Sequence, residues 1–286
     1  MITAQAHAKI NWSLNIVSAR DDGYHELDML MQSLELCDEL TFEPAKWLTL
    51  SINGRQLPVG GRNLVIRAAN ALNEYMGRRR GARITLKKSI PIRAGLGGGS
   101  ADCAATLIAL NKLWNLRLPL EKLMEIGATL GADVPFCMQG GLARVRGIGE
   151  KLAPITPAPR VPLVLIHPGA GLSTASVFQR WDEGGFPEEH ADIDRLQTAL
   201  MQGDLAAMAE ASGNSLEQAA ILLLPEVETA MQQLRQAGAR MVRMTGSGSA
   251  VFGVFESDEA AMTAAERIPG AIFTHTEGKD AETAQQ

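Results

Sequence analysis

Hydrophobic and polar residues alternate strictly near the start of the sequence, from His7 to Ile16. Every second residue is apolar, and the positions between them are polar. An alternation with a period of two is typical of a half-buried β-strand, so we predict a strand at residues 7–16. A polar turn around Asp22-Gly23 follows, and the mostly apolar stretch at residues 27–36 predicts a second, well-buried strand.

Spacings of three and four residues indicate helices farther along the chain. Within residues 101–114 this spacing places Cys103, Leu107, Leu110 and Trp114 on one helical face. Asn63 is a typical N-cap and Gly77 a typical helix end, so residues 63–76 are predicted to be helical. The other predicted helices are at residues 120–130, 193–201, 205–211, 215–222, 226–237 and 258–267. The other predicted strands are at residues 47–52 (followed by a turn at Asn53-Gly54), 82–88, 142–145, 161–166, 250–255 and 271–275.

Residues 153–162 include four prolines. Because proline fixes φ and lacks an N–H group, this segment cannot form regular helix or a central strand. We interpret it as the link between an N-terminal domain at residues 1–153 and a C-terminal domain at residues 161–277. The polar residues 278–286 are predicted to form a disordered tail. Strands and helices follow in mixed order, which favours an α+β fold with two layers per domain over a doubly wound parallel sheet.

Composition and charge narrow the class of protein. The sequence has 46% hydrophobic and 21% charged residues and a net charge of -5, which gives no indication of a nucleic-acid or membrane partner. The three cysteines are too far apart in sequence for a disulfide framework or a zinc site. No apolar segment has the length of a membrane span, and the N-terminus lacks a signal-peptide pattern, so we expect a reducing, cytoplasmic setting.

The candidate chemistry begins with a glycine run, Gly95-Leu96-Gly97-Gly98-Gly99-Ser100, between a predicted strand and a predicted helix. Absent side chains let backbone N–H groups approach a ligand, and a helix N-terminus adds unpaired donors and partial positive charge. The run therefore predicts a phosphate-binding site, with a tight turn that holds no ligand as the alternative. Ser100 is placed to cap the helix or to bind a phosphate or its metal ion.

Two common nucleotide-binding loops are excluded by the residues around Ser100. A Walker loop requires Lys-Ser or Lys-Thr after the last glycine, whereas Ser100 is followed by Ala101 and Asp102. A dinucleotide-binding fingerprint requires glycine at the position of Ser100 and a βαβ unit with an acidic residue about twenty residues later. Asp102 itself has two interpretations, a solvated acid in the first helical turn or a contact to a magnesium ion.

Several blocks of the sequence resemble one superfamily. Pro91-Ile92-Arg93-Ala94-Gly95-Leu96-Gly97-Gly98-Gly99-Ser100-Ala101 is similar to the phosphate loop of the GHMP small-molecule kinases, and Met244-Thr245-Gly246-Ser247-Gly248-Ser249-Ala250 to their third glycine-rich block. Within that superfamily, three blocks resemble the 4-diphosphocytidyl-2-C-methyl-D-erythritol kinases. These blocks are Ala8-Lys9-Ile10-Asn11, Asp22-Gly23-Tyr24-His25-Glu26-Leu27 and Leu130-Gly131-Ala132-Asp133-Val134-Pro135-Phe136. The similarity extends from about Ala8 to Phe255.

The resemblance implies a two-domain GHMP kinase-like fold with the active site in the cleft between the domains. It also implies that ATP, with Mg²⁺, phosphorylates the 2-hydroxyl of 4-diphosphocytidyl-2-C-methyl-D-erythritol in the non-mevalonate (MEP) isoprenoid route. We expect a small-molecule substrate, no nucleic-acid or membrane partner, and a monomer or weak homodimer. Two alternatives stay open: a GHMP kinase acting on a sugar, an amino acid or mevalonate, and a GHMP-fold sensor that binds its ligand without turnover.

Carried over onto matching positions, the resemblance implies two catalytic residues. Asp133 would act as general base toward the attacking hydroxyl, and Lys9 would orient Asp133 and neutralise developing charge. Without the resemblance, the two would read as a turn carboxylate and a solvated lysine on the polar face of a strand. The implied ATP-binding residues are Asn63, Lys88 and Pro91, Ile92, Arg93, Ala94, Gly95, Leu96, Gly97, Gly98, Gly99, Ser100 and Ala101.

Aromatic residues match the cytidine-binding positions of the family. Tyr24 would stack on the base, and His25 would read its polar edge. Phe178 matches a second aromatic residue that sandwiches the cytosine, with a core phenylalanine as the alternative. The base-recognition site is therefore predicted from these three residues.

The remaining predicted substrate contacts are polar. Asn11 lies two residues beyond Lys9, so the same strand face carries both side chains, and we expect Asn11 to bind the substrate by a hydrogen bond. Thr245, Gly246 and Ser247 offer donors in a glycine turn for a substrate or product phosphate. No residue is assigned as a metal ligand, apart from Ser100 through the Mg²⁺ that accompanies ATP.

Overall fold

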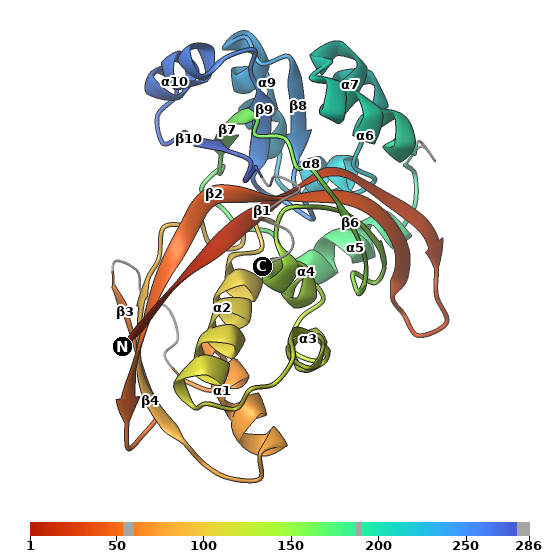
Figure 1. Cartoon of the computed structure of the whole chain (residues 1–286). Helices are drawn as coiled ribbons and strands as arrows, with labels where there is room; N and C mark the ends of the chain where they lie inside the picture. The colour runs from red at the N-terminus through yellow and green to blue at the C-terminus, as the bar shows by residue number, and fades with distance from the viewer. Residues whose placement is uncertain (54–59, 187–189, 279–286) are drawn as a thin grey trace. The chain divides into compact units, whose positions relative to one another are not determined.

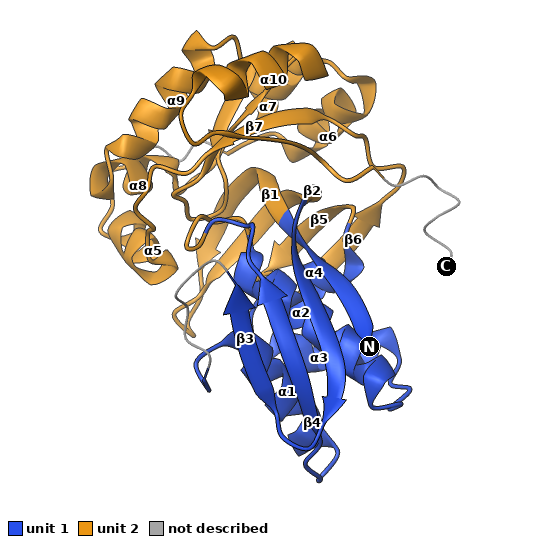
Figure 2. Cartoon of the chain, turned by 90° about the vertical axis from the view of Figure 1, so that its left-hand side faces the viewer, with its two compact units in different colours: residues 1–8, 36–91, 97–140 blue, residues 9–35, 92–96, 141–286 orange. Residues whose placement is uncertain are grey.

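The computed structural model describes residues 1–53, 60–186 and 190–278, which form two compact units (Figure 2). Unit 1 consists of residues 1–8, 36–91 and 97–140, and unit 2 of residues 9–35, 92–96 and the described residues from 141 onward. The long strands β1 (Ile2–Ala19) and β2 (His25–Ala45) each contribute residues to both units. Residues 9–35 therefore group with the C-terminal half of the chain, a division that differs from the linear boundary expected at the prolines.

Unit 1 contains part of a six-stranded mixed sheet and helices α1 to α4 (Figure 2). Residues 39–45 of β2 pair antiparallel with β4 (Gly81–Lys87), which pairs parallel with β3 (Thr49–Asn53). Helices α1 (Leu64–Tyr75) and α2 (Gly98–Leu113) pack on each other and share one buried core with the sheet. Helices α3 (Leu120–Ala128) and α4 (Val134–Gln139) complete the unit. This core holds the helix that begins within the glycine run.

The strands of unit 2 in this six-stranded sheet pair antiparallel. Residues 27–32 of β2 pair with β5 (Leu142–Gly147), which pairs with β6 (Lys151–Ile155). The proline-rich segment is thus partly a strand, because β6 includes Pro154. An edge strand tolerates proline, since its outer N–H groups have no ladder partner to bind.

The second sheet of unit 2 has the order β10-β7-β9-β8, with all neighbours antiparallel. Its strands are β7 (Pro162–Ile166), β8 (Met241–Met244), β9 (Val251–Val254) and β10 (Ile272–His275). Helices α9 (Glu226–Gln236) and α10 (Asp258–Arg267) pack on this sheet (Figure 1). The other helices are α5 (Thr174–Asp182), α6 (Ile193–Gln202), α7 (Leu205–Ala211) and α8 (Glu217–Leu223). The turn between β8 and β9 carries Thr245, Gly246 and Ser247.

The α+β prediction is confirmed, since every strand pairing described above except that of β3 with β4 is antiparallel. Helices α7 and α10 have the predicted bounds, and Asn63 caps α1 as expected. The predictions missed α4, α5, β6 and β8, which are short and carry no clear periodic pattern. The predicted turn at Asn53-Gly54 and the tail beyond Gly278 lie partly or wholly outside the described residues. Within the described ranges, no helix is long and apolar enough to cross a membrane.

Candidate active site

The glycine run lies where the chain enters α2. Gly97 is the N-cap residue, with a φ of 69°, and Gly98, Gly99 and Ser100 begin the helix. The helix therefore begins three residues earlier than predicted, and Ser100 belongs to its first turn instead of capping it. Because the first N–H groups of a helix have no intrahelical partner, this turn presents the backbone donors that an anion site requires.

Five predicted site residues of unit 2 lie together, and we call them the Lys9 cluster: Lys9, Asn11, Gly95, Thr245 and Gly246. The Lys9 ammonium donates to Asn11 Oδ1 at 2.7 Å, and the Asn11 N–H donates to Thr245 Oγ1 at 3.0 Å. Lys9 and Asn11 are each only 3% exposed. The interpretation of Lys9 as a solvated strand lysine is therefore wrong.

Two glycines allow the backbones of the Lys9 cluster to approach closely. A Cβ on Gly246, whose φ is 57°, would lie 3.2 Å from Lys9 Nζ and from the Gly95 carbonyl oxygen. A Cβ on Gly95 would lie 2.2 Å from the Thr245 carbonyl oxygen, a distance that no side chain can occupy. Steric exclusion therefore requires glycine at position 95, whereas at position 246 the positive φ favours glycine and a side chain would be tightly packed.

A second group of buried charges lies in unit 1, and we call it the Lys88 triad: Asp38, Lys88 and Asp102. The Lys88 ammonium donates to Asp102 Oδ2 at 2.9 Å and also donates to Asp38 Oδ2. The side chains of Lys88, Asp38 and Asp102 are 5%, 0% and 7% exposed. The triad joins β2, the segment after β4 and helix α2.

The structure supports neither of the two interpretations of Asp102, as a solvated acid in the first helical turn or as a contact to a magnesium ion. It is the fifth residue of α2, so it lies beyond the first turn, and its burial contradicts the solvated interpretation. Its hydrogen bond to Lys88 gives no support to magnesium contact. Burial raises the pKa of Asp102 from 3.8 to about 7, because the loss of hydration outweighs the attraction of Lys88 and adds to the repulsion by Asp38.

Asp133 is the N-cap residue of α4, where the sequence predicted a stiff loop. Pro135 occupies one of the first helical positions, where proline is favoured, and it fixes the direction in which α4 leaves Asp133. The neighbouring Gly131 brings Ser100 near this turn, because a Cβ on Gly131 would lie 3.6 Å from Ser100 Oγ. The predicted base and the first turn of α2 therefore belong to one packed region of unit 1.

The predicted cytidine-binding residues His25 and Phe178 are in contact within unit 2. Their rings stack with centroids 4.9 Å apart, and Trp181 meets the His25 ring edge-on at 5.5 Å. An aromatic ring between two others needs about 7 Å, twice an ordinary contact distance. A base can therefore stack on Phe178 only on the ring face away from His25, or after the two rings separate. Tyr24 is 60% exposed.

Sequence reasoning missed Asp182, which holds the ring of His25. Asp182 Oδ1 lies 2.7 Å from His25 Nε2. Because a carboxylate only accepts, Nε2 must carry a proton, and in the neutral ring Nδ1 is then an acceptor. The signal for this pair was absent from the sequence, since α5 was not predicted and the two residues are 157 positions apart.

Asn214 is a second residue that the sequence analysis missed. Its Nδ2 donates to the carbonyl oxygens of Met244 and Gly246, at 2.9 and 2.8 Å, and so fixes the turn of the Lys9 cluster. Ser247, predicted for phosphate contact, shares a hydrogen bond of 2.9 Å with Thr174. Asn63 Oδ1 accepts from the Val65 N–H at 2.9 Å, so this predicted ATP contact also has a capping role.

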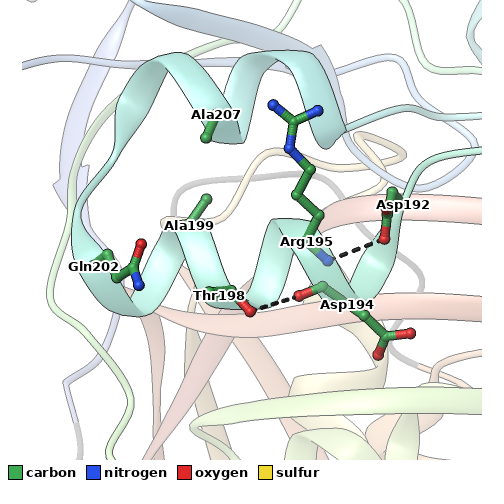
Figure 3. A pocket seen from close by; sticks show the side chains of 7 residues that line it. All are labelled: Asp192, Asp194, Arg195, Thr198, Ala199, Gln202 and Ala207. Atoms are coloured by element: carbon green, nitrogen blue, oxygen red, sulfur yellow. Dashed lines mark hydrogen bonds between the residues drawn. The ribbon is translucent and has the colours of Figure 1, made fainter.

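A separate open hollow of about 480 Å³ lies along α6 and α7 (Figure 3). Its lining includes Asp192, Asp194 and Arg195 and none of the predicted site residues. Asp192 caps α6 through the Arg195 N–H, and Asp194 pairs with Arg144. These acids serve the local structure, and we assign the hollow no role in the predicted reaction.

Among the described residues, no group of three His, Cys, Asp or Glu side chains could hold a metal ion. The donor set thus does not fit a resident metal centre. Mg²⁺ often keeps several water ligands and binds substrate phosphates, so it would enter as the complex with ATP.

Comparisons with known proteins give one consistent result. The family model for the GHMP kinases N terminal domain matches residues 63–141, and the model for GHMP kinases C terminal matches residues 196–272. The 4-diphosphocytidyl-2-C-methyl-D-erythritol kinase of Pelotomaculum thermopropionicum is 46% identical over 269 residues, with 93% of each chain covered. That of Moorella thermoacetica is 44% identical over 283 residues, with 96% of this chain and 99% of the relative covered.

Solved structures agree with these sequence relatives. A crystal structure of 4-(cytidine 5'-diphospho)-2C-methyl-D-erythritol kinase matches with a TM-score of 0.83 and 37% identity, covering 97% of this chain and 100% of the other. A homoserine kinase from Cytophaga hutchinsonii matches with a TM-score of 0.69 at 20% identity, covering 95% and 94%. At 20% identity, the match to the homoserine kinase shows only that the two proteins share a fold.

Proposed function

Because the chain belongs to the 4-diphosphocytidyl-2-C-methyl-D-erythritol kinases, a family of GHMP kinases, we propose that it phosphorylates the 2-hydroxyl of 4-diphosphocytidyl-2-C-methyl-D-erythritol with ATP. This reaction is a step of the non-mevalonate route to isoprenoid precursors. The observation that carries the proposal is the identity of 46% over 93% of both chains. The grouping of the predicted residues in the Lys9 cluster supports it.

The donor is ATP with Mg²⁺, and its phosphates are proposed to bind the glycine run. Backbone N–H groups of Gly98, Gly99 and Ser100 at the start of α2 suit phosphate oxygens, and the helix dipole favours their negative charge. The Ser100 hydroxyl is the side chain of this turn that can bind a phosphate oxygen or a ligand of the metal ion. Mg²⁺ supplies charge neutralisation to the phosphates when bound.

In the proposed reaction, the 2-hydroxyl oxygen attacks the γ-phosphorus, the bond to the ADP oxygen breaks, and Asp133 takes the hydroxyl proton. Lys9 stabilises the negative charge that develops on the transferred group and orients Asp133. The hydrogen bond to Asn11 supports this role, because it holds a buried ammonium in one position. Asn11, Thr245, Gly246 and Ser247 are proposed to position the acceptor.

Selectivity for a cytidyl acceptor is proposed to come from Tyr24, His25 and Phe178. The contact between His25 and Phe178 supports this assignment, since it brings together two predicted base-binding residues that are far apart in sequence. Phe178 is half-buried, which favours a ligand-facing role over the core alternative. A kinase for mevalonate or homoserine has no need of such a surface, and a sensor without turnover has no need of a base such as Asp133.

The test is an assay with the purified full chain, ATP, Mg²⁺ and each candidate acceptor. ADP should form with 4-diphosphocytidyl-2-C-methyl-D-erythritol and at less than about a hundredth of that rate with mevalonate or homoserine. Equal or faster turnover of mevalonate or homoserine would support the alternative kinases. Folded protein that binds ATP but forms no ADP with any acceptor would support the sensor.

A further inference from the structure

We propose that Lys88 is a positioning residue for ATP binding, whose ammonium joins Asp38 and Asp102 and thereby fixes the start of α2. The inference rests on the proposed use of the glycine run as the ATP site. From the family resemblance, we expected Lys88 to contact ATP directly. The proposed role is indirect instead. The geometry of the Lys88 triad carries this proposal.

Asp38 anchors the chain segment that leads into the glycine run. Its side chain is fully buried, and its Oδ1 accepts from the backbone N–H groups of Ser89, at 2.6 Å, and Ile90, at 2.9 Å. The other carboxylate oxygen accepts from Lys88. One carboxylate of β2 thus fixes three consecutive residues just before the phosphate loop.

Asp102 extends this anchorage to α2. Its Oδ2 accepts from Lys88 at 2.9 Å, so the ammonium bridges the segment after β4 and the second turn of the helix. Gly98, the first helical residue, lies against the bridge, because a Cβ there would meet Lys88 Nζ at 3.3 Å and Ile90 Cγ2 at 3.0 Å. The bridge therefore lies directly beside the backbone donors proposed to bind the phosphates.

The surroundings of Lys88 favour positioning over direct contact with the nucleotide. The side chain is only 5% exposed, and its ammonium already binds two carboxylates. Breaking either bond to reach a phosphate would leave a buried carboxylate without its cation, which is costly. The Asp102 Oδ1 atom has no hydrogen-bond partner among the described residues, and the Lys88 ammonium is the cation that Oδ2 contacts.

The test compares Lys88→Met, Asp102→Leu, Asp102→Asn and the double variant Lys88→Met/Asp102→Leu. ATP affinity is measured by calorimetry without acceptor, and the KM values for ATP and for the cytidyl acceptor are measured by ADP release. Lys87→Met is the matched control, because Lys87 is the exposed neighbour of Lys88. Calorimetry keeps this test independent of the acceptor, so failure of the proposed function would appear separately as a lack of ADP.

We expect Lys88→Met and Asp102→Leu each to weaken ATP binding about tenfold, with the acceptor KM unchanged within about threefold. The double variant should weaken it no more than Lys88→Met alone, since both changes break one bridge. Asp102→Asn keeps an acceptor for Lys88 and should recover most of the affinity.

Two results would overturn the proposal. One is normal ATP affinity in folded Asp102→Leu together with weak binding in Lys88→Met, which would assign Lys88 to the nucleotide itself. The other is an additive loss in the double variant. If Lys88→Met does not fold, the comparison of Asp102→Leu with Asp102→Asn tests the proposal by itself. Equal ATP affinity in these two variants would contradict a positioning role for the contact between Lys88 and Asp102.

Discussion

The two buried lysines, Lys9 and Lys88, have similar settings, but we propose that their charges act on different groups. Each has its ammonium beside a glycine, Gly246 at 3.2 Å from Lys9 and Gly98 at 3.3 Å from Lys88, measured to a Cβ placed on the glycine. The Lys9 ammonium donates to the amide oxygen of Asn11, and the Lys88 ammonium donates to the carboxylates of Asp38 and Asp102. The same residue type, matched to the same family, therefore supports two different proposals.

The difference concerns where each positive charge acts. In the Lys88 triad, the cation offsets negative charge that belongs to the protein, so its removal should disturb the fold around α2. The Lys9 ammonium is instead proposed to act on the negative charge that develops on the transferred phosphoryl group. We therefore expect Lys9 variants to lose rate, and Lys88 variants to lose ATP affinity. Four predictions test this contrast, in order of decreasing effect.

The largest effect is expected from Asp133→Asn. An amide cannot take the proton of the attacking hydroxyl, so kcat should fall by about 10²- to 10⁴-fold, while ATP affinity stays within about threefold of the unchanged chain. Steady-state ADP release and calorimetry with ATP measure the two quantities. Turnover at a near-normal rate would show that Asp133 is not the base.

Lys9→Met should lower kcat by about 10²- to 10³-fold, because it removes charge stabilisation from the transition state. Lys9→Met should weaken ATP binding less than Lys88→Met does. In contrast, Lys9→Met should lower kcat more than Lys88→Met does. Because Lys9 and Asp133 are proposed to act on one hydroxyl, the double variant should lose little more rate than the more damaging single change. Fully additive losses would mean that the two residues act independently.

The pH dependence of stability should reveal Asp102. Its pKa in the folded protein is raised to about 7 by burial, against 3.8 for the ordinary group. Between these values the folded chain keeps a proton that the unfolded chain has lost. The contribution of Asp102 to the free energy of unfolding is therefore complete below about pH 4, falls as the pH rises and levels off above about pH 7.

The slope from one such group is up to about 1.4 kcal/mol per pH unit. Asp102→Asn should remove it, which urea unfolding at pH 5, 6, 7 and 8 would show. The charged and titratable groups that interact with Asp102 are Lys88, Asp38 and Cys103, whose own pKa burial raises to about 12, with Arg67 near Cys103. Equal slopes in the two proteins would mean that Asp102 is ionised throughout this range.

The smallest effect is expected from Asp182→Asn. The change replaces the carboxylate that orients His25, so the KM for the cytidyl acceptor should rise about three- to tenfold, with kcat and the ATP KM nearly unchanged. Glu183→Gln is the control, because Glu183 is the adjacent exposed acid and pairs with Arg180 instead. Nitrogen NMR of His25 should show the Nε2-protonated tautomer only when Asp182 is present. An unchanged KM for the cytidyl acceptor would show that Asp182 does not contribute to recognition of the base.

The fold was largely predictable because most of its elements carry strong local patterns. Period-two alternation located β1, and the cap residue Asn63 located the start of α1. Helix α4 was missed since it has only six residues, and α5 since Val177 is its one fully buried residue. The grouping of residues 9–35 with unit 2 arises from long strands that contribute to both units, which no local proline signal can reveal.

The site residues likewise include some that were predictable from the sequence and some that were not. Lys9 and Asn11 share a strand face by period alone, and the resemblance added Thr245 and Gly246, which the structure brings into contact with them. Asp38 and Asp182 were missed because their partners, Lys88 and His25, lie 50 and 157 positions away. A buried ion pair gives no local sequence signal, so Asp102 read as a surface acid until its burial was known.

The position of the transferred phosphate tests the central proposal most directly. In 4-diphosphocytidyl-2-C-methyl-D-erythritol, the 2-carbon carries a methyl group and no hydrogen. Phosphorus NMR of the product of the full chain with ATP and Mg²⁺ should therefore show a new monoester signal without three-bond coupling to hydrogen, next to the signals of ADP. A new monoester signal split by such coupling, or ADP without any new monoester, would contradict phosphorylation of the 2-hydroxyl.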